Sequence, residues 1–409
     1  MTSSFPPPAA RLAYLDGLRV VALLLLIPYH VGMYYVSWDW HVKSPLSAVV
    51  APLVEPFMLL SSPWRLGLLF LVAGAASQIL HARRGGWGLV RERSQRLLLP
   101  LVFGMLVIVP PQAYFELRTQ APQLLPSGGD YFAFWAAYLR GGPFCQAQEC
   151  LTVPTWNHLW FLPYLWLYAV LAAAFSAVAA CRAAGSEGPQ RGARLPAWAW
   201  LLLPALPLML FRWVLLPSFP STHDLVSDFY NHAQYGYLFA LGWLSRGVAA
   251  GLWEAALRWR WQCLGLAVLA WGLLVHYFQA YEALEPPAAL RQLMRGVWCL
   301  MAWWAILAAC GWAQRFFWRD GPVMRALAGA VFCVYVFHQT VIVGLTQVLA
   351  PAQLGAAQEA LLLIALTFVV SGLAYLLLRG IPGLRACVGI QPKAPGRMKS
   401  SVPEGVLRK

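Results

Sequence analysis

Long apolar runs separated by short polar stretches occupy most of the sequence. A helix needs about 20 apolar residues to cross the roughly 30 Å hydrocarbon core of a bilayer. Ten runs approach that length, which predicts an all-α, polytopic membrane protein with about ten transmembrane helices. These runs lie near residues 15–36, 62–81, 97–113, 157–181, 197–214, 233–249, 261–279, 294–314, 326–348 and 357–379.

Two segments near the N-terminus need separate interpretation. The run from Ala48 to Leu60 is short and contains Glu55 and two prolines, so we expect a re-entrant or interfacial piece. No small-residue cleavage site follows the first apolar run, which favours a retained first helix over a removed signal peptide.

Basic residues gather on one side of the predicted helices. Twenty-two of the thirty Lys and Arg residues fall on the side of the two termini, seven on the other, and Arg19 lies within the first helix. Cytoplasmic loops retain basic residues, so both termini are predicted to be cytoplasmic, and an even number of helices follows. The net charge of +14 is then topological, and nucleic acid is not an expected partner.

Composition supports this class of protein and limits the possible metal sites. The chain is 60% hydrophobic and 11% charged, which excludes an ordinary soluble domain. Its eight cysteines form no CxxC pair and no zinc-like spacing with histidine, so no metal site is predicted. Cys145 and Cys150 share a predicted external loop, where a disulfide and two free thiols are both open interpretations.

The first predicted helix carries three polar residues that are costly in a membrane, Asp16, Arg19 and His30. Eleven residues separate Arg19 from His30, which places them within about 20° of one face and about 16 Å apart on a straight helix. Asp16 precedes Arg19 by three residues and can pair with it. One interpretation is that these residues form a functional site. The other is that Arg19 extends to the cytoplasmic surface and that His30 is a hydrogen-bonded core residue.

A second candidate is the pair Arg93 and Arg96, one helical turn apart at the cytoplasmic start of the third predicted helix. Guanidinium groups at this spacing suit bidentate contacts with phosphate. A basic cluster that serves only to orient the helix is the alternative.

The remaining candidates lie toward the external face. His158 and Trp160 open the fourth predicted helix, and His338 lies about as deep in the ninth as His30 does in the first. Two histidines at one level predict a polar chamber. Asp228 and His232, at the external end of the sixth predicted helix, are candidates for lining its mouth. Trp160 has the alternative role of an interface anchor.

These segments together resemble the acyltransferase family 3 membrane proteins, and the resemblance covers nearly the whole chain. Within this family, three segments are most similar to the glucan biosynthesis protein C-type branch: NHLWFLPYLWLY, VYVFHQTVIV and RGIPGLRACVGIQP. The features that carry the family resemblance are Arg19-x10-His30, Arg93-x-x-Arg96, LLFLVAG ending at Gly74, His158-Leu-Trp-Phe-Leu, and Tyr335-x-x-His338.

The resemblance implies a multi-pass protein of the bacterial inner membrane. It implies a membrane domain over residues 11–385, with cytoplasmic tails at 1–10 and 386–409. Members of the family move acyl groups from acyl-CoA to envelope carbohydrates. Acetyl-CoA or succinyl-CoA is therefore the expected donor substrate, with no permanently bound cofactor, and the expected acceptor is a carbohydrate such as osmoregulated periplasmic glucan.

The resemblance also suggests roles for the candidate residues. Arg93 and Arg96 are expected to hold the phosphates of CoA, and Arg19 to steady the donor or a developing negative charge. Asp16 would orient Arg19, and His30 would act as general base on the acceptor hydroxyl. The acceptor side would be shaped by His338, His158 and Trp160. A secondary transporter and a non-catalytic subunit of a polysaccharide export system are the alternative functions.

Overall fold

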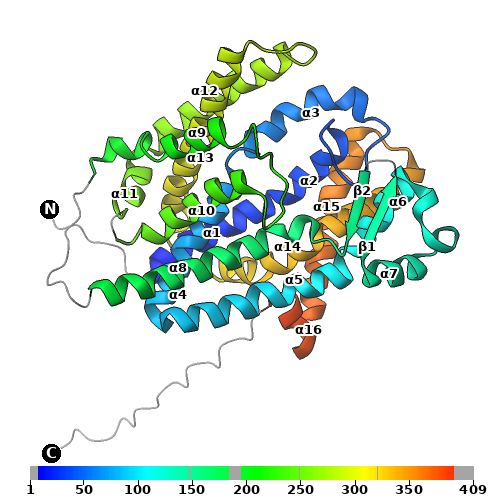
Figure 1. Cartoon of the computed structure of the whole chain (residues 1–409), viewed down its shortest axis with the longest axis horizontal. Helices are drawn as coiled ribbons and strands as arrows, with labels where there is room; N and C mark the ends of the chain where they lie inside the picture. Colours follow the sequence, from blue (N-terminus) through cyan, green and yellow to red (C-terminus); the bar gives the residue numbers. More distant parts are fainter. Residues whose placement is uncertain (1–7, 147–148, 184–194, 248, 320, 391–409) are drawn as a thin grey trace, which may run out of the picture.

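The computed structural model describes residues 8–146, 149–183, 195–247, 249–319 and 321–390 (Figure 1). Nearly all of its regular structure is helical, as the apolar runs predict. The longer helices are α1 (Pro8–Leu24), α2 (Leu26–Tyr35), α3 (Ser47–Ser61), α4 (Arg65–Arg93), α6 (Pro110–Gln120), α7 (Tyr131–Arg140), α8 (Phe161–Ala183), α9 (Ala205–Val214), α10 (Phe229–Leu244), α11 (Gly251–Arg258), α12 (Arg260–Ala280), α13 (Ala288–Phe316), α14 (Pro322–Leu349) and α15 (Ala356–Leu378).

Eight helical stretches among the described residues are long and apolar enough to cross a membrane. Each of the ten predicted runs coincides with helix, but the second and third fall within one continuous stretch, Ser47–Gln120. The sixth run forms α10, whose 16 residues are fewer than a full crossing needs. An all-α, multi-pass membrane protein is therefore confirmed, whereas ten crossings and cytoplasmic termini stay predictions.

The second and third predicted runs are joined by a stretch that is not uniformly α-helical. Gly85 interrupts α4 with φ +71°, a conformation that glycine adopts easily because it has no Cβ. Beyond α4, the chain passes through the π-helical turn η1 (Ser94–Leu98), α5 (Leu99–Phe103) and a second π-helical turn, η2 (Gly104–Ile108). The first of these turns contains Arg96, and the stretch leads from Arg93, the last residue of α4, to α6.

The centre of the molecule is built from α1, α4, α8 and α14, which run alongside one another (Figure 1). The α4 helix also packs closely against α10. A Cβ atom on Gly74 would lie 2.0 Å from the backbone oxygen of Phe239, and one on Gly242 would lie 1.9 Å from that of Leu71. The two backbones therefore touch, an approach that small residues permit between membrane helices.

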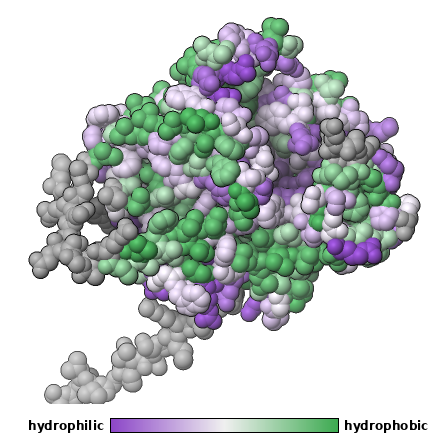
Figure 2. Space-filling view, viewed as in Figure 1, coloured by the Kyte–Doolittle hydropathy of each residue, from purple (hydrophilic) through white to green (hydrophobic). Residues whose placement is uncertain are grey.

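The surface shows the apolar character expected of a chain in contact with lipid. Apolar residues cover much of the face seen in Figure 2. Val49, Leu53 and Phe57 of α3 are each about 70% exposed or more, although Pro52 and Pro56 lie within the same helix. The segment predicted as re-entrant or interfacial thus forms a helix with an outward apolar side.

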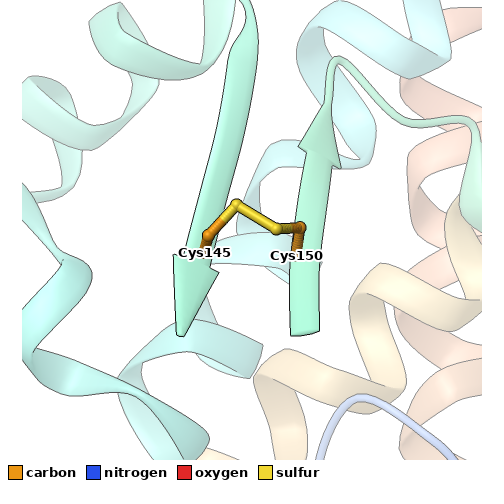
Figure 3. Close-up of a disulfide and its surroundings, with 2 residues drawn as sticks. All are labelled: Cys145 and Cys150. Atoms are coloured by element: carbon orange, nitrogen blue, oxygen red, sulfur yellow. A yellow bond between two sulfur atoms is a disulfide. The ribbon is translucent and has the colours of Figure 1, made fainter. Parts of the chain in front are cut away.

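One small hairpin is added to the all-α architecture. Strand β1 (Gly142–Gln146) pairs antiparallel with β2 (Glu149–Val153), and Cys145 lies directly opposite Cys150. The two cysteines form a disulfide (Figure 3). The sequence left a disulfide and two free thiols open, and the structure shows the disulfide.

Candidate active site

His30 lies on α2, shortly after an interruption of the first membrane helix. Pro28 has no backbone N–H, so it cannot donate the usual helical hydrogen bond to the carbonyl of Leu24. The two helices α1 and α2 meet at Leu25, which keeps right-handed helical φ/ψ values, and together they form one span with a local irregularity. The spacing of Arg19 and His30 therefore crosses an irregularity that straight-helix geometry does not include.

His30 and His338 are in direct contact, although they come from helices at opposite ends of the chain. Nδ1 of His30 lies 2.9 Å from Nε2 of His338, which is 1% exposed. Nδ1 of His338 lies 2.6 Å from the backbone oxygen of Tyr335. Since a carbonyl only accepts, a neutral His338 donates from Nδ1 and accepts at Nε2. His30 then donates from its own Nδ1, which leaves the lone pair of neutral His30 on Nε2.

His158 lies against the same helix and is held at both ring nitrogens. Its Nε2 lies 3.1 Å from the backbone oxygen of Val336, and its Nδ1 lies 3.3 Å from Nε2 of Gln112. Its ring is perpendicular to that of His338, with 5.2 Å between centroids. The hydroxyl of Tyr335 donates to the His158 backbone oxygen at 2.7 Å. His158 therefore joins the turn before α8 to α14.

A chain of amides continues from this histidine group toward the surface. Gln339 donates to Oε1 of Gln112 at 3.2 Å and contacts Nε2 of His41 at 2.8 Å. Nδ1 of His41 contacts the carboxylate of Glu116. The side chains of His41 and Glu116 are 17% and 21% exposed, whereas Gln112 and Gln339 are buried. The histidines thus belong to a polar network that reaches partly exposed groups.

Arg65, at the start of α4, is a buried cation beside this group. It is 3% exposed, its guanidinium lies 3.7 Å from the ring centroid of Tyr29, and it donates to Ser61 at 3.0 Å. No carboxylate lies within ion-pair distance of it in the part of the chain that the structure describes. Tyr29, whose ring it covers, directly precedes His30, and the centroids of those two rings are 5.6 Å apart. A buried charge without a counterion is costly, which is typical of a functional group in a membrane.

The candidate residues of the predicted cytoplasmic end form a second group. Arg19 pairs with Asp16 at 3.1 Å, and its charge acts on both Arg93 and Arg96. Arg96 pairs with Glu92 at 3.3 Å, while Arg93 donates to the hydroxyl of Ser77 at 2.9 Å. The structure therefore brings four sequence-predicted residues together: Asp16, Arg19, Arg93 and Arg96.

A surface hollow adjoins this basic group. It has a volume of about 420 Å³ and is lined by Arg84, Gly88, Arg91, Glu92 and Gln95. Glu92 contacts Arg84 at 2.5 Å on one side and Arg96 on the other. The hollow offers guanidinium groups to a polyanion at the predicted cytoplasmic side of the bundle.

Asp228, His232 and Trp160 belong to a third group, which holds the loop before α10. Asp228 accepts from the Tyr164 hydroxyl at 2.7 Å, and His232 contacts the Tyr168 hydroxyl at 3.0 Å. Trp160 stacks on His223, at 4.1 Å between centroids. Burial lowers the pKa of His223, and the carboxylate of Asp228 partly opposes that shift.

Within the described residues, no hydrogen bond, ion pair or ring contact joins Asp228 or His232 to His30, His158 or His338. Trp160 turns toward His223, although His158 lies two positions before it in the same short helix, η5 (Asn157–Trp160). The roles of these three residues at an acceptor site stay predictions.

Several residues near His30 are not candidates from the sequence. In the sequence, Arg65 is only one of the basic residues on the predicted external side. Its position at the start of an apolar run is the feature that could have identified it. Gln112 and Gln339 interrupt apolar runs, and uncharged polar residues at such positions are a weaker form of the same signal. His41 and Glu116 lie outside the predicted apolar runs, so the sequence does not indicate their pairing.

Residues 12–378 match a family model described as an acyltransferase domain. The chain is similar to Glucans biosynthesis protein C of Escherichia coli (strain K12 / DH10B), with 30% identity over 110 residues. These residues are 26% of this chain and 27% of the relative. The protein of the same name in Escherichia coli O1:K1 / APEC is 29% identical over 110 residues, with the same coverage.

The alignments thus span about a quarter of the length of these curated relatives. No solved structure matches the chain.

Proposed function

We propose that this chain, which belongs to the acyltransferase family whose model matches residues 12–378, moves an acyl group from cytoplasmic acyl-CoA to a carbohydrate hydroxyl outside the membrane. The contact between His338 and His30 is the observation that supports this chemistry most directly. It leaves Nε2 of His30 as the basic atom, and a neutral imidazole is the usual acceptor of a hydroxyl proton.

The donor is proposed to bind at the cytoplasmic group of arginines. Arg93 and Arg96 would contact the CoA phosphates, and Arg19 would extend the positive surface while Asp16 orients it. The pantetheine arm would then enter the bundle and carry the thioester toward α2. Acetyl-CoA and succinyl-CoA are the donors to test first.

In the proposed reaction, Nε2 of His30 takes the proton of the acceptor hydroxyl as the oxygen attacks the thioester carbonyl. The carbonyl oxygen becomes negatively charged, and buried Arg65 is the nearby cation suited to stabilise it. The carbon–sulfur bond then breaks, and the departing thiolate takes the proton from His30. The products are an acyl ester and free CoA, so atoms and charge balance.

The acceptor proposal draws on the curated relatives, which are named for glucan biosynthesis. Osmoregulated periplasmic glucan is accordingly the first acceptor to examine, and the bacterial inner membrane is the proposed location.

The deciding experiment uses a deletion strain complemented with the wild type, with His30→Ala, or with His276→Ala. His276 lies exposed on α12 and is a matched control for loss of an imidazole. Mass spectrometry of periplasmic glucan and surface polysaccharide should show an acyl substituent with the wild type and the control, but not with His30→Ala. Equal acylation by His30→Ala, in membranes that contain equal amounts of protein, would contradict the proposed role of His30.

A further inference from the structure

A cavity of about 520 Å³ lies between α3 and the helices α9, α12 and α13. Figure 2 shows the molecule hollowed in this region, with polar residues visible inside. The residues that decide its chemistry are Tyr29, Trp38, Glu55, Arg212, Glu282 and Trp298. The proposed acyl-CoA site lies elsewhere, around Arg93 and Arg96.

The charges in the cavity argue against two classes of ligand. Two carboxylates, Glu55 and Glu282, face one guanidinium, Arg212, which already donates to the Tyr230 hydroxyl at 2.8 Å and stacks on Trp298 at 4.4 Å. An anion would therefore meet net negative charge. A lipid chain would desolvate charged groups without replacing their hydrogen bonds.

A neutral, hydroxyl-rich molecule suits the same residues. The rings of Trp38 and Trp298 offer flat apolar surfaces, while carboxylate oxygens accept hydrogen bonds from hydroxyl groups. Both bonds that Glu55 accepts from Ser37, at 2.6 Å and 3.1 Å, go to Oε1, so Oε2 is open to a ligand. A carbohydrate chain presents the two complementary surfaces, C–H faces and hydroxyl groups.

The cavity adjoins the histidine pair through one residue. Tyr29 lines the cavity and directly precedes His30 on α2, and the centroids of their rings are 5.6 Å apart. The guanidinium of Arg65 covers the ring of Tyr29. A ligand in the cavity is thus one side chain away from both the proposed base and the proposed oxyanion partner.

We infer that this cavity binds the carbohydrate acceptor, with the tryptophan rings against its sugar faces and Glu55 and Glu282 on its hydroxyl groups. The inference rests on the proposed function and adds a location for the acceptor site.

The test uses purified protein in nanodiscs and a short β-linked glucose oligosaccharide as the probe. Binding is measured by calorimetry without donor, and transfer by release of free CoA. Trp38→Leu and Glu282→Gln should each weaken oligosaccharide binding about tenfold and raise the acceptor KM equally, because each removes one main contact. The donor KM and the kcat at saturating acceptor should stay unchanged.

Glu285→Gln is the matched control, because Glu285 is exposed nearby but does not line the cavity. His30→Ala should bind the oligosaccharide normally and fail to transfer. If the cavity variants bind and react like the wild type while His30→Ala is inactive, the acceptor site is elsewhere and the proposed function stands. If the wild type binds through the cavity residues but forms no acyl product, the proposed function is wrong and the carbohydrate site stands. Absence of binding by the wild type would overturn the inference.

Discussion

Nε2 of His338 accepts from Nδ1 of His30, and the backbone oxygen of Tyr335 determines that direction. His338 thereby does for His30 what a carboxylate does for the histidine of a hydrolase triad: it selects the tautomer and the ring orientation. Its own two nitrogens are occupied, so we propose that His338 positions His30 and is not a second base.

We expect His338→Ala to lower kcat about 100-fold with little change in the donor KM, since misplacing a catalytic group costs about that much. His338→Gln keeps an amide oxygen that can accept from His30 and an amide hydrogen for the Tyr335 carbonyl, so it should recover part of the rate. The measurement is free CoA release at saturating substrates. Wild-type rates of CoA release in both variants would mean that His338 has no orienting role.

Arg93 and Arg96 should act on donor binding alone. Replacing either by Ala removes a charge-assisted contact worth about 1.5–3 kcal/mol, so the donor KM should rise about tenfold or more. Arg83→Ala is the matched control, because Arg83 is an exposed arginine on α4. Steady-state kinetics with varied acyl-CoA distinguish the variants. A rise in the acceptor KM at constant donor KM would contradict the assignment.

Arg65→Gln should reduce kcat by about 10² to 10³, the usual cost of removing a group that stabilises a developing oxyanion. Arg65→Lys keeps the charge but loses the planar contact with Tyr29, and it should be intermediate. Size-exclusion profiles must first show that both variants fold. Full activity in Arg65→Gln would remove Arg65 from the mechanism.

The contact between α4 and α10 predicts a stability effect. Gly242→Ala places a Cβ atom against the Leu71 backbone and should destabilise the protein by about 1–3 kcal/mol, the range for overpacking. Gly272→Ala has nothing within 4 Å of the new Cβ and should be neutral or slightly stabilising. Thermal unfolding in detergent compares them. Equal midpoints would show that the helices separate at little cost.

Orientation is testable with single-cysteine variants. Cys181, exposed at the end of α8, should resist an impermeant maleimide in spheroplasts and react in inverted vesicles. Cys150, freed by Cys145→Ser, should show the reverse pattern. The opposite result would place the termini outside the cytoplasm.

Helices were predictable here because hydropathy along a membrane segment is a local property of the sequence. The number of crossings was less accessible, because Gly85 and the π-helical turns join two apolar runs, and α10 is short. The match to the acyltransferase model confirms the family named from sequence motifs. The roles of individual residues stay predictions.

The candidate site was predictable only in part. The positions of His30 and His338 within their predicted helices place them at the same depth in the membrane, and the fold brings their rings into contact. That no carboxylate among the described residues pairs with Arg65 could not be anticipated, since it depends on which helices surround α4. The same holds for the His41–Glu116 pair, which joins two segments that are distant in sequence.

The two π-helical turns on either side of α5 change how this stretch must be compared between proteins. A π turn holds one residue more than an α turn, so each turns everything beyond it by about 100° relative to a regular helix. An alignment scored with a uniform period of 3.6 therefore places Gln112 on the wrong face. A one-residue deletion in either turn would remove the extra residue, restore α geometry and keep Gln112 facing His158, so single gaps at 94–98 and 104–108 change this site less than gaps in the regular turns between them.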